Sequence, residues 1–398
     1  MDMKVAMKYE NRYGLGTEPL STEDCISPEY FRKEKELLFK RSWLCVGRVE
    51  DLPEVGSYFV KDMPTLDTSI IVTRGKDNKI NAFHNICTHR LNKIMKPGEG
   101  KAKAFTCQFH GWAFGLDGQL IHSSNENLFP DFHKEKLGLP IVHADVWNGF
   151  IFINVAAKPK QGLRESLGAL ADQFDGFFDN MEMRGAWEVT INANWKLVLD
   201  SQTEGYHAPT LHAKSLRDAV AGKDNPNCLL NDVRIFDKHR AMSVYGNPEY
   251  RPVTIEGKAG GYAKTPLYPA TSATTDALPP GVNPEKNPLW VFDLTVLFPN
   301  FELVTASGWY GMMLYWPLAA DKTHFEMRQF LYKPETAGDI ISQEYGLAHM
   351  RDVIREDYST LEGTQQMMQS GVLKEVHLCD EEITVRHNHV AVAQAISE

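Results

Sequence analysis

Two short segments, each with one cysteine and one histidine, place the tightest constraint on how this chain folds. The first segment holds Cys87 and His89, the second holds Cys107 and His110, and 17 residues separate them. Both segments lie at the ends of β-prone runs, INAFHNIC and AFTCQFHGWAF. Two thiolates and two imidazoles, divided in this way, predict a metal centre that two tight loops present on a β scaffold.

The mixed ligand types distinguish between two kinds of metal centre. A Rieske-type [2Fe-2S] cluster needs two thiolates on one iron and two histidines on the other. The alternative is a Cys2His2 zinc site, in which the cysteines typically share one turn and the histidines share one helix. Each segment here mixes the two ligand types, which favours the cluster, with Cys87, His89, Cys107 and His110 as its ligands.

A second group of possible ligands lies in the sequence NWKLVLDSQTEGYHAPTLH. A helix from Leu197 to Ala208 would bring Glu204 and His207 onto one face, because positions three and four residues apart are neighbours on a helix. Pro209 would then end the helix and let His212 turn back towards the same point. The sequence therefore predicts a metal site with two histidines.

The third ligand is expected to be a carboxylate, since two histidines and one carboxylate leave a face of Fe(II) open for dioxygen. In LAHMRDVIREDYSTLEG, Asp357 is the one charge on an apolar stripe with Met350 and Ile354. A buried carboxylate needs a partner, which is either a metal ion or an arginine. Asp352 is a weaker candidate, and Glu356 is expected to face solvent or a neighbouring arginine.

Taken together, these motifs resemble the catalytic (alpha) subunits of the Rieske non-haem iron oxygenases, the aromatic-ring-hydroxylating oxygenase family. The similar features are C-x-H-R, C-x-x-H-G-W, N-W-K followed by an acid, G-Y-H and a later histidine, and E-D-x-x-x-x-E. The resemblance spans about residues 31–394. One position departs from the pattern: Leu91 stands where the family usually has glycine, so the loop there is expected not to use a positive φ easily.

The resemblance implies a role for each candidate residue. His207, His212 and Asp357 would bind one mononuclear Fe(II). Glu204 stands where many relatives have an aspartate that connects a Rieske histidine of one subunit to an iron-ligating histidine of the next. Glu204 is therefore expected to bridge electrons to the iron from the partner subunit's His110, in a head-to-tail homotrimer; a small beta subunit is possible.

The resemblance also implies an α+β fold, in which an all-β Rieske 2Fe-2S domain joins a helix-grip catalytic domain whose antiparallel sheet wraps a long helix. Short β-prone runs from Gly56 to Val155 and a polar linker near residues 156–166 agree with this division. The expected domains are residues 41–158 and 159–398, preceded by a helical segment, residues 1–40, that packs on the catalytic domain. Ser27 and Pro28 form a helix-start signal, and the final helix is expected over residues 342–369.

The implied function is that of a terminal oxygenase component. Such an enzyme uses O2 and electrons from a ferredoxin or flavin reductase, with NAD(P)H acting only through that reductase. An aromatic or other hydrophobic small molecule would be hydroxylated, by ring dihydroxylation or monohydroxylation, as in aromatic hydrocarbon catabolism. Oxidative O- or N-demethylation is the alternative. A more remote alternative is a Rieske electron-transfer protein without oxygenase activity.

Charge and hydropathy exclude other classes of partner. The formal net charge is -10 and the pI is near 5.8, whereas a nucleic-acid-binding protein needs a basic face. The first residues carry too many charges for a secretory signal, and no apolar run is long enough to span a membrane. A cytoplasmic protein with no nucleic-acid or membrane partner is expected.

Overall fold

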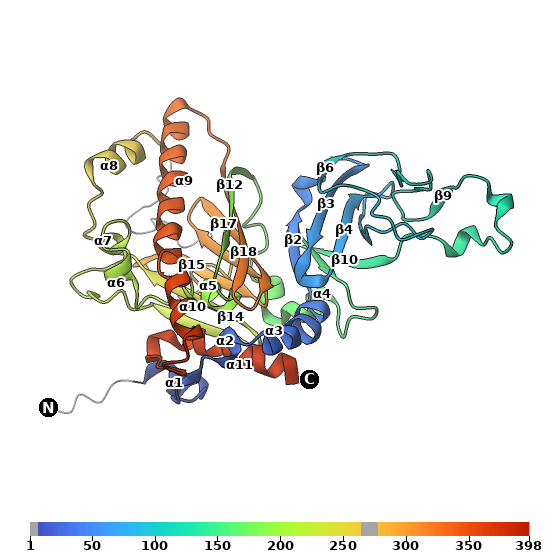
Figure 1. The fold of residues 1–398 in the computed structure, drawn as a ribbon. Helices are drawn as coiled ribbons and strands as arrows, with labels where there is room; N and C mark the ends of the chain where they lie inside the picture. The colour runs from blue at the N-terminus through green and yellow to red at the C-terminus, as the bar shows by residue number, and fades with distance from the viewer. Residues whose placement is uncertain (1–6, 264–277, 398) are drawn as a thin grey trace. The chain divides into compact units, whose positions relative to one another are not determined.

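The computed structural model describes residues 7–263 and 278–397 (Figure 1). The chain divides into two compact units: one is Lys35–Ser166, and the other combines Met1–Glu34 with Leu167–Glu398. Each unit has its own antiparallel sheet, so the predicted α+β class is confirmed. Within the described residues, no helix combines the length and hydropathy needed to cross a membrane.

The unit Lys35–Ser166 is mostly β. Its larger sheet has the strand order β2-β11-β10-β5-β4-β3-β6, and a smaller sheet has the order β7-β8-β9. The strands of the larger sheet are β2 (Leu44–Arg48), β3 (Ser57–Met63), β4 (Thr68–Arg74), β5 (Ile80–His84), β6 (Gly98–Lys101), β10 (Ile141–Trp147) and β11 (Phe150–Asn154). Those of the smaller sheet are β7 (Phe105–Thr106), β8 (Ala113–Phe114) and β9 (Leu120–His122).

The other unit is built on one antiparallel sheet with the order β12-β18-β17-β16-β15-β14-β13. The long helix α9 (Ala337–Tyr358) contacts β12, and α5 (Trp195–Asp200) packs on β17 and β18. This is the helix-grip arrangement that the resemblance implied. The strands are β12 (Met181–Ile191), β13 (Asp232–Phe236), β14 (His239–Tyr245), β15 (Trp290–Leu297), β16 (Phe301–Ala306), β17 (Trp309–Ala319) and β18 (Lys322–Tyr332).

Helix α9 starts earlier than predicted and ends earlier. Thr336 and Asp339 form a capping box that starts it before residue 342, and a break after Tyr358 separates it from α10 (Leu361–Gln369). The predicted helix start at Ser27 is confirmed, because the Ser27 side chain accepts a hydrogen bond from the Tyr30 backbone N–H at 3.3 Å. The remaining helices are α1 (Lys8–Tyr13), α2 (Glu23–Ile26), α3 (Pro28–Lys33), α4 (Leu163–Leu167), α6 (Ala208–Leu211), α7 (Arg217–Val220), α8 (Thr254–Gly261) and α11 (Ile383–Ser397).

Residues near the two ends of the chain belong to the same unit. Strand β1 (Leu20–Ser21) pairs antiparallel with β19 (Glu375–Val376). The backbone N–H of Tyr9 donates to Oδ2 of Asp380 at 2.8 Å. The residues just before the C-terminal helix α11 are thereby held against the segment that precedes the β unit.

Candidate metal centres

The two cysteine–histidine segments form a matched pair of loops in the β unit. One loop follows β5, and the other connects β7 to β8. In the first, the N–H of Leu91 donates to the carbonyl of Cys87 at 2.9 Å; in the second, the N–H of Gly111 donates to the carbonyl of Cys107 at 3.0 Å. The cysteine N–H groups are matched as well, each bonding to the carbonyl five residues on, at 2.8 Å. Leu91 and Gly111 therefore occupy equivalent positions.

This equivalence shows that the loop adopts a positive φ at Leu91 despite the expected cost. Its φ is 59°, close to the 73° of Gly111, so the loop takes the left-handed conformation even though the residue is not glycine. A side chain with a Cβ in this region costs about 1–2 kcal/mol. The Leu91 side chain is 72% exposed, so packing does not offset that cost.

Replacing Leu91 with glycine is expected to raise the free energy of unfolding by about 0.5–1 kcal/mol, since relief of strain exceeds the added freedom of the unfolded chain. Thermal unfolding of the two proteins measures the change. Leu128→Gly is a matched control, because Leu128 is 73% exposed in the same unit but has no positive φ. That variant is expected to lose stability, and equal losses in both would contradict the strain at Leu91.

The four side chains of these loops fit a Rieske cluster. Cys87 and Cys107 are 2% and 1% exposed, and the rings of His89 and His110 lie 4.6 Å apart between centroids. His89 stacks on Trp112, and its Nδ1 is buried without a hydrogen-bond partner among the described residues. Such an atom is costly unless it binds something, and a metal ion is a suitable partner.

Nearby hydrogen-bond donors lower the pKa of one of the two thiols, that of Cys107. Burial raises the pKa of Cys107, but the backbone amides of Phe109 and His110 and the side chain of Asn92 outweigh it, so the net shift is downward. Nδ2 of Asn92 lies 3.6 Å from the Cys107 sulfur. A thiolate is the form that binds iron, so this loop favours the ligand state.

In the other unit, His207 and His212 flank one short helix. The predicted continuous helix to Ala208 is wrong: α5 ends at Asp200, and a turn leads to α6 (Ala208–Leu211). Pro209 lies in the first turn of α6 and so starts a helix rather than ending one. One helical turn then brings both histidines together. The predicted pairing of the histidines is thus found, although the predicted helix is not.

His207, His212 and Asp357 meet at one point. Nε2 of His207 lies 3.1 Å from Nε2 of His212, and Oδ1 of Asp357 lies 3.3 Å and 2.9 Å from these two atoms. Adjacent ligands of an octahedral ion with bonds of about 2.1 Å are about 3.0 Å apart. The three atoms therefore have the spacing of a facial triad around one divalent ion. Asp352 lies outside this group, with 57% of its side chain exposed, beside Arg351.

Each histidine of the triad has a carboxylate behind it. Nδ1 of His207 hydrogen-bonds to Glu204, and Nδ1 of His212 lies 2.8 Å from Oε2 of Glu356, which also accepts from Ser215. The expectation that Glu356 faces solvent or an arginine is wrong. Carboxylates in this position orient a metal-binding histidine and leave Nε2 free for the metal.

The charges of the site favour a cation between them. Burial lowers the pKa of His207, but hydrogen bonds with Asp357 and Glu204 raise it to about 10. Asp357, 2% exposed, keeps a lowered pKa despite burial because both histidines face it. Asp357 and Glu204 thus stabilise positive charge at the histidines. A divalent ion bound there would supply that charge in place of the protons.

The triad lines a cavity whose opposite wall is apolar. Directly paired residues of neighbouring antiparallel strands face the same side of a sheet. Met242 pairs with Leu294, and Leu294 pairs with Val304, so these side chains form one row. Phe292 is the one aromatic side chain in this cavity's lining, counting only the described residues.

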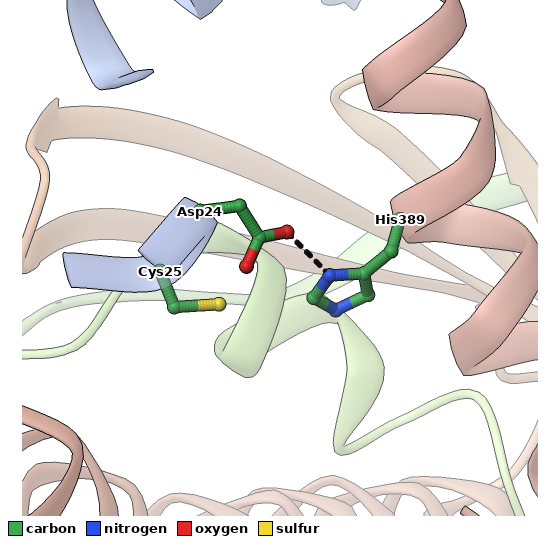
Figure 2. Close-up of side chains that lie close together, drawn as sticks. All are labelled: Asp24, Cys25 and His389. Atoms are coloured by element: carbon green, nitrogen blue, oxygen red, sulfur yellow. Dashed lines mark hydrogen bonds and ion pairs between the residues drawn. The ribbon is translucent and has the colours of Figure 1, made fainter. Parts of the chain in front are cut away.

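The histidines without a spacing partner lie outside both groups, as expected. His84 hydrogen-bonds to Thr68, and Nδ1 of His239 accepts from the Phe298 N–H at 3.0 Å. The others are His122, His133 and His143. Besides the triad and the two cysteine–histidine loops, one further group of three possible ligands occurs in the described residues: Asp24, Cys25 and His389, which the sequence patterns did not single out (Figure 2).

Comparison with known proteins finds a family match for each of the two parts of the chain. Residues 42–133 match the Rieske [2Fe-2S] domain, and residues 178–398 match the ring hydroxylating alpha subunit (catalytic domain). The carnitine monooxygenase oxygenase subunit of Escherichia coli (strain K12) is 34% identical over 46% of this chain and 49% of its own length. The glycine betaine monooxygenase oxygenase subunit of Chromohalobacter salexigens is 31% identical over 63% of this chain and 56% of its own length. The chain thus spans about half the length of these curated relatives.

Solved structures support the fold. A quaternary ammonium Rieske monooxygenase has a TM-score of 0.74 at 21% identity, covering 95% of both chains. Naphthalene 1,2-dioxygenase from Rhodococcus sp. has a TM-score of 0.75 at 19% identity, covering 97% of this chain and 96% of its own. A [2Fe-2S] cluster and mononuclear iron are the cofactors that these two domains carry. The catalytic-domain match spans more than half of the residues of this chain. The chain therefore belongs to the ring-hydroxylating alpha-subunit family, with a Rieske [2Fe-2S] domain in front of the catalytic domain.

Proposed function

We propose that the chain is the terminal oxygenase component of a Rieske oxygenase that hydroxylates a neutral hydrophobic small molecule. The observation that carries this proposal is the triad of His207, His212 and Asp357 at the wall of an apolar cavity. A metal ion there would meet dioxygen and an apolar substrate in the same space. Ferredoxin or a flavin reductase would supply the electrons, with NAD(P)H acting through that reductase.

The proposed ligands divide between the two units. Cys87, His89, Cys107 and His110 would hold the cluster, and His207, His212 and Asp357 would hold Fe(II). The two cofactors, when bound, supply electron storage and dioxygen activation. The protein's own contribution is orientation and exclusion of water: Glu204 and Glu356 fix the histidine rings, and the apolar wall keeps bulk solvent from the site.

Electron transfer between subunits is part of the proposal. Inter-subunit electron transfer is known for a quaternary ammonium Rieske monooxygenase of similar fold. In this chain, Glu204 keeps 11% of its side chain exposed while it hydrogen-bonds to His207. Besides its two hydrogen bonds with His207, from Nδ1 and from the backbone N–H, it can accept a third from the partner subunit's His110 in a head-to-tail homotrimer, and this contact would connect a cluster to the next iron.

The cavity lining favours a neutral substrate over a quaternary ammonium compound. Relatives bear the names carnitine, glycine betaine and choline monooxygenase. A trimethylammonium group is typically held against several aromatic faces. Among the described residues, this cavity offers Phe292 as its single aromatic ring, surrounded by aliphatic side chains and methionines such as Met242, Met313 and Met350. Oxidative O- or N-demethylation is the second candidate reaction, with which the monooxygenase names of these relatives are compatible.

A single-turnover experiment tests the proposal. The reduced, iron-loaded protein is exposed to isotope-labelled dioxygen with a panel of neutral aromatic and aliphatic compounds, and products are analysed by mass spectrometry. Labelled hydroxyl groups on a neutral compound, with none on carnitine, glycine betaine or choline, are the expected result. Loss of a methyl group as formaldehyde would favour the second candidate. Turnover of the three quaternary ammonium compounds alone would overturn the proposed substrate class.

A further inference from the structure

Three side chains from distant parts of the chain converge at a second buried point in the catalytic unit. Asp24 and Cys25 of α2 and His389 of α11 point towards one another (Figure 2). Nδ1 of His389 lies 2.5 Å from Oδ2 of Asp24, and Nε2 of the same ring lies 3.0 Å from Oδ2 of Asp200, the last residue of α5. The His389 side chain is 10% exposed. One ring thus joins three helices.

Both nitrogens of this ring must carry protons. A carboxylate oxygen only accepts hydrogen bonds, so each nitrogen that faces one has to donate, and the doubly protonated form is the imidazolium. Burial lowers the pKa of His389, but hydrogen bonds with Asp200 and Asp24 outweigh it and raise the pKa to about 9. The bridge is therefore charged at neutral pH.

The surroundings balance this charge without a metal ion. Nζ of Lys196 donates to the main-chain oxygen of Asp24 at 2.8 Å and pairs with Glu34 at 2.5 Å. A cation bound by Asp24, Cys25 and His389 would have to displace the imidazolium proton beside this ammonium group. It would also have to ionise Cys25, a thiol whose pKa burial raises well above the usual value. These costs favour the proton over the metal.

The other titratable groups around the bridge come from several elements. None of them takes the place of Asp24 or Asp200 as a hydrogen-bond partner of the His389 ring. They are Cys25 on α2, Tyr30 on α3 against the Lys196 ammonium, Glu34 after α3, Lys196 on α5, and three groups that act on Asp200 over a longer range: Arg240 on β14, Glu302 on β16 and Glu382 before α11. Burial raises the pKa of Glu302 to about 8, which also lies between about pH 7 and 9.5, so a step in this range is assigned to His389 by its shift in Asp24→Asn.

Besides the bridge, helix α11 makes two hydrogen bonds to the end of α5 and the turn that leads from it to Glu204 and His207. Nδ2 of Asn388 donates to Oδ1 of Asp200 at 2.8 Å, and the Thr384 hydroxyl donates to the carbonyl of Thr203. Thr203 directly precedes Glu204, which in turn hydrogen-bonds to His207. The start of this turn is therefore fixed by side chains that lie more than 180 residues further along the chain.

We propose that His389 is a positioning residue whose charged bridge between Asp24 and Asp200 holds the turn that carries Glu204 and His207 in its metal-binding arrangement. This role rests on the proposed function, because it acts on the same iron site. When the ring loses its proton, one of its two hydrogen bonds must break, and the end of α5 is released. Metal retention then becomes sensitive to alkaline pH at a site that does not touch the metal.

The test is the rate of Fe(II) release from the anaerobic, iron-loaded protein into ferrozine, from about pH 7 to about pH 9.5. In the wild type, release is expected to accelerate about threefold to tenfold with a midpoint near pH 9, a smaller effect than loss of a direct partner of a ligand histidine. His389→Gln is expected to release iron at the faster rate throughout, without a step. Asp24→Asn keeps an acceptor but removes a charge, so its step is expected at lower pH.

A matched variant and a second readout separate the alternatives. Cys25→Ser is expected to keep the wild-type step. A cation that is bound by Asp24, Cys25 and His389 in the wild type and lost in Cys25→Ser would contradict the bridge. Chemical unfolding across the same pH range reports on folding: the folded pKa lies above the ordinary 6.5, so the stabilisation is complete below that value and is lost as pH rises through about 9. A step that does not move in Asp24→Asn would contradict the proposal. A wild type that binds no mononuclear iron would contradict the proposed function as well.

Discussion

Asp357→Ala is expected to lose the mononuclear iron and to reduce oxygenase turnover by about three orders of magnitude or more, while the [2Fe-2S] cluster stays intact. Asp357 supplies the carboxylate oxygen that lies 2.9 Å and 3.3 Å from the two histidine nitrogens, and it is 2% exposed, so no solvent-facing group can replace it. Two histidines alone hold Fe(II) weakly. Iron analysis, sulfide analysis and turnover measure the three parts of this expectation.

Asp352→Ala is the matched control for this prediction. Asp352 lies on the same helix, but 57% of its side chain is exposed and it pairs with arginines rather than with the histidines. It is expected to keep wild-type iron and turnover. Equal iron content in the Asp357 and Asp352 variants would contradict the assignment of Asp357 as a ligand.

Glu204→Gln is expected to slow electron transfer from cluster to iron by about a hundredfold or more while iron can still be loaded. The glutamine amide keeps the shape of the side chain but loses the charge and one of the acceptor oxygens that a bridge between two imidazoles requires. Rapid mixing of the reduced protein with dioxygen and substrate, followed by the absorbance of the cluster, measures its re-oxidation. The cluster is expected to stay reduced in the variant.

Glu356→Gln distinguishes a bridge from simple orientation of a ligand. Glu356 lies 2.8 Å from Nδ1 of His212, just as Glu204 hydrogen-bonds to Nδ1 of His207, so both substitutions weaken a similar contact. Loss of orientation would lower Fe(II) affinity about tenfold to a hundredfold in either variant. With saturating Fe(II), the Glu356 variant is expected to re-oxidise its cluster at close to the wild-type rate. Similar slow re-oxidation in both would contradict the bridging role of Glu204.

The ligand pattern could be predicted because it depends on local spacing. Two residues between Cys107 and His110, or four between His207 and His212, are readable in the chain itself. The apolar stripe around Asp357 is equally local, and Met350, Ile354 and Asp357 are all buried in the structure. For this reason the residues of the triad and the α+β class were predictable from one sequence.

The turn between α5 and α6 was not predictable from local spacing, and it makes a close long-range contact. Gly205 packs so closely on the carbonyl of Cys228 that a Cβ at Gly205 would lie 2.5 Å from that oxygen. The chain leaves the helical path after Asp200, although the helical spacing of Glu204 and His207 suggested a continuous helix. Local periodicity contains no information about such a neighbour.

Glu356 and His389 were missed for the same reason. Glu356 finds its partner 144 residues earlier in the chain, and His389 finds Asp24 and Asp200 365 and 189 residues earlier. On sequence alone, Glu356 lies about a third of a turn from the apolar stripe, and His389 belongs to neither of the two ligand motifs. Only the packing of α9 and α11 against the segment that carries Asp200 and His212 brings these residues to their partners.

The most direct test of this account is a measurement of iron, acid-labile sulfide and zinc per chain, together with an EPR spectrum of the dithionite-reduced protein. Three irons and two sulfides per chain, with a Rieske-type signal, are predicted, since two irons belong to the cluster and one to the triad. Two irons and two sulfides in a protein loaded with Fe(II) would leave an electron carrier without an oxygenase site. Zinc without sulfide would contradict both metal assignments.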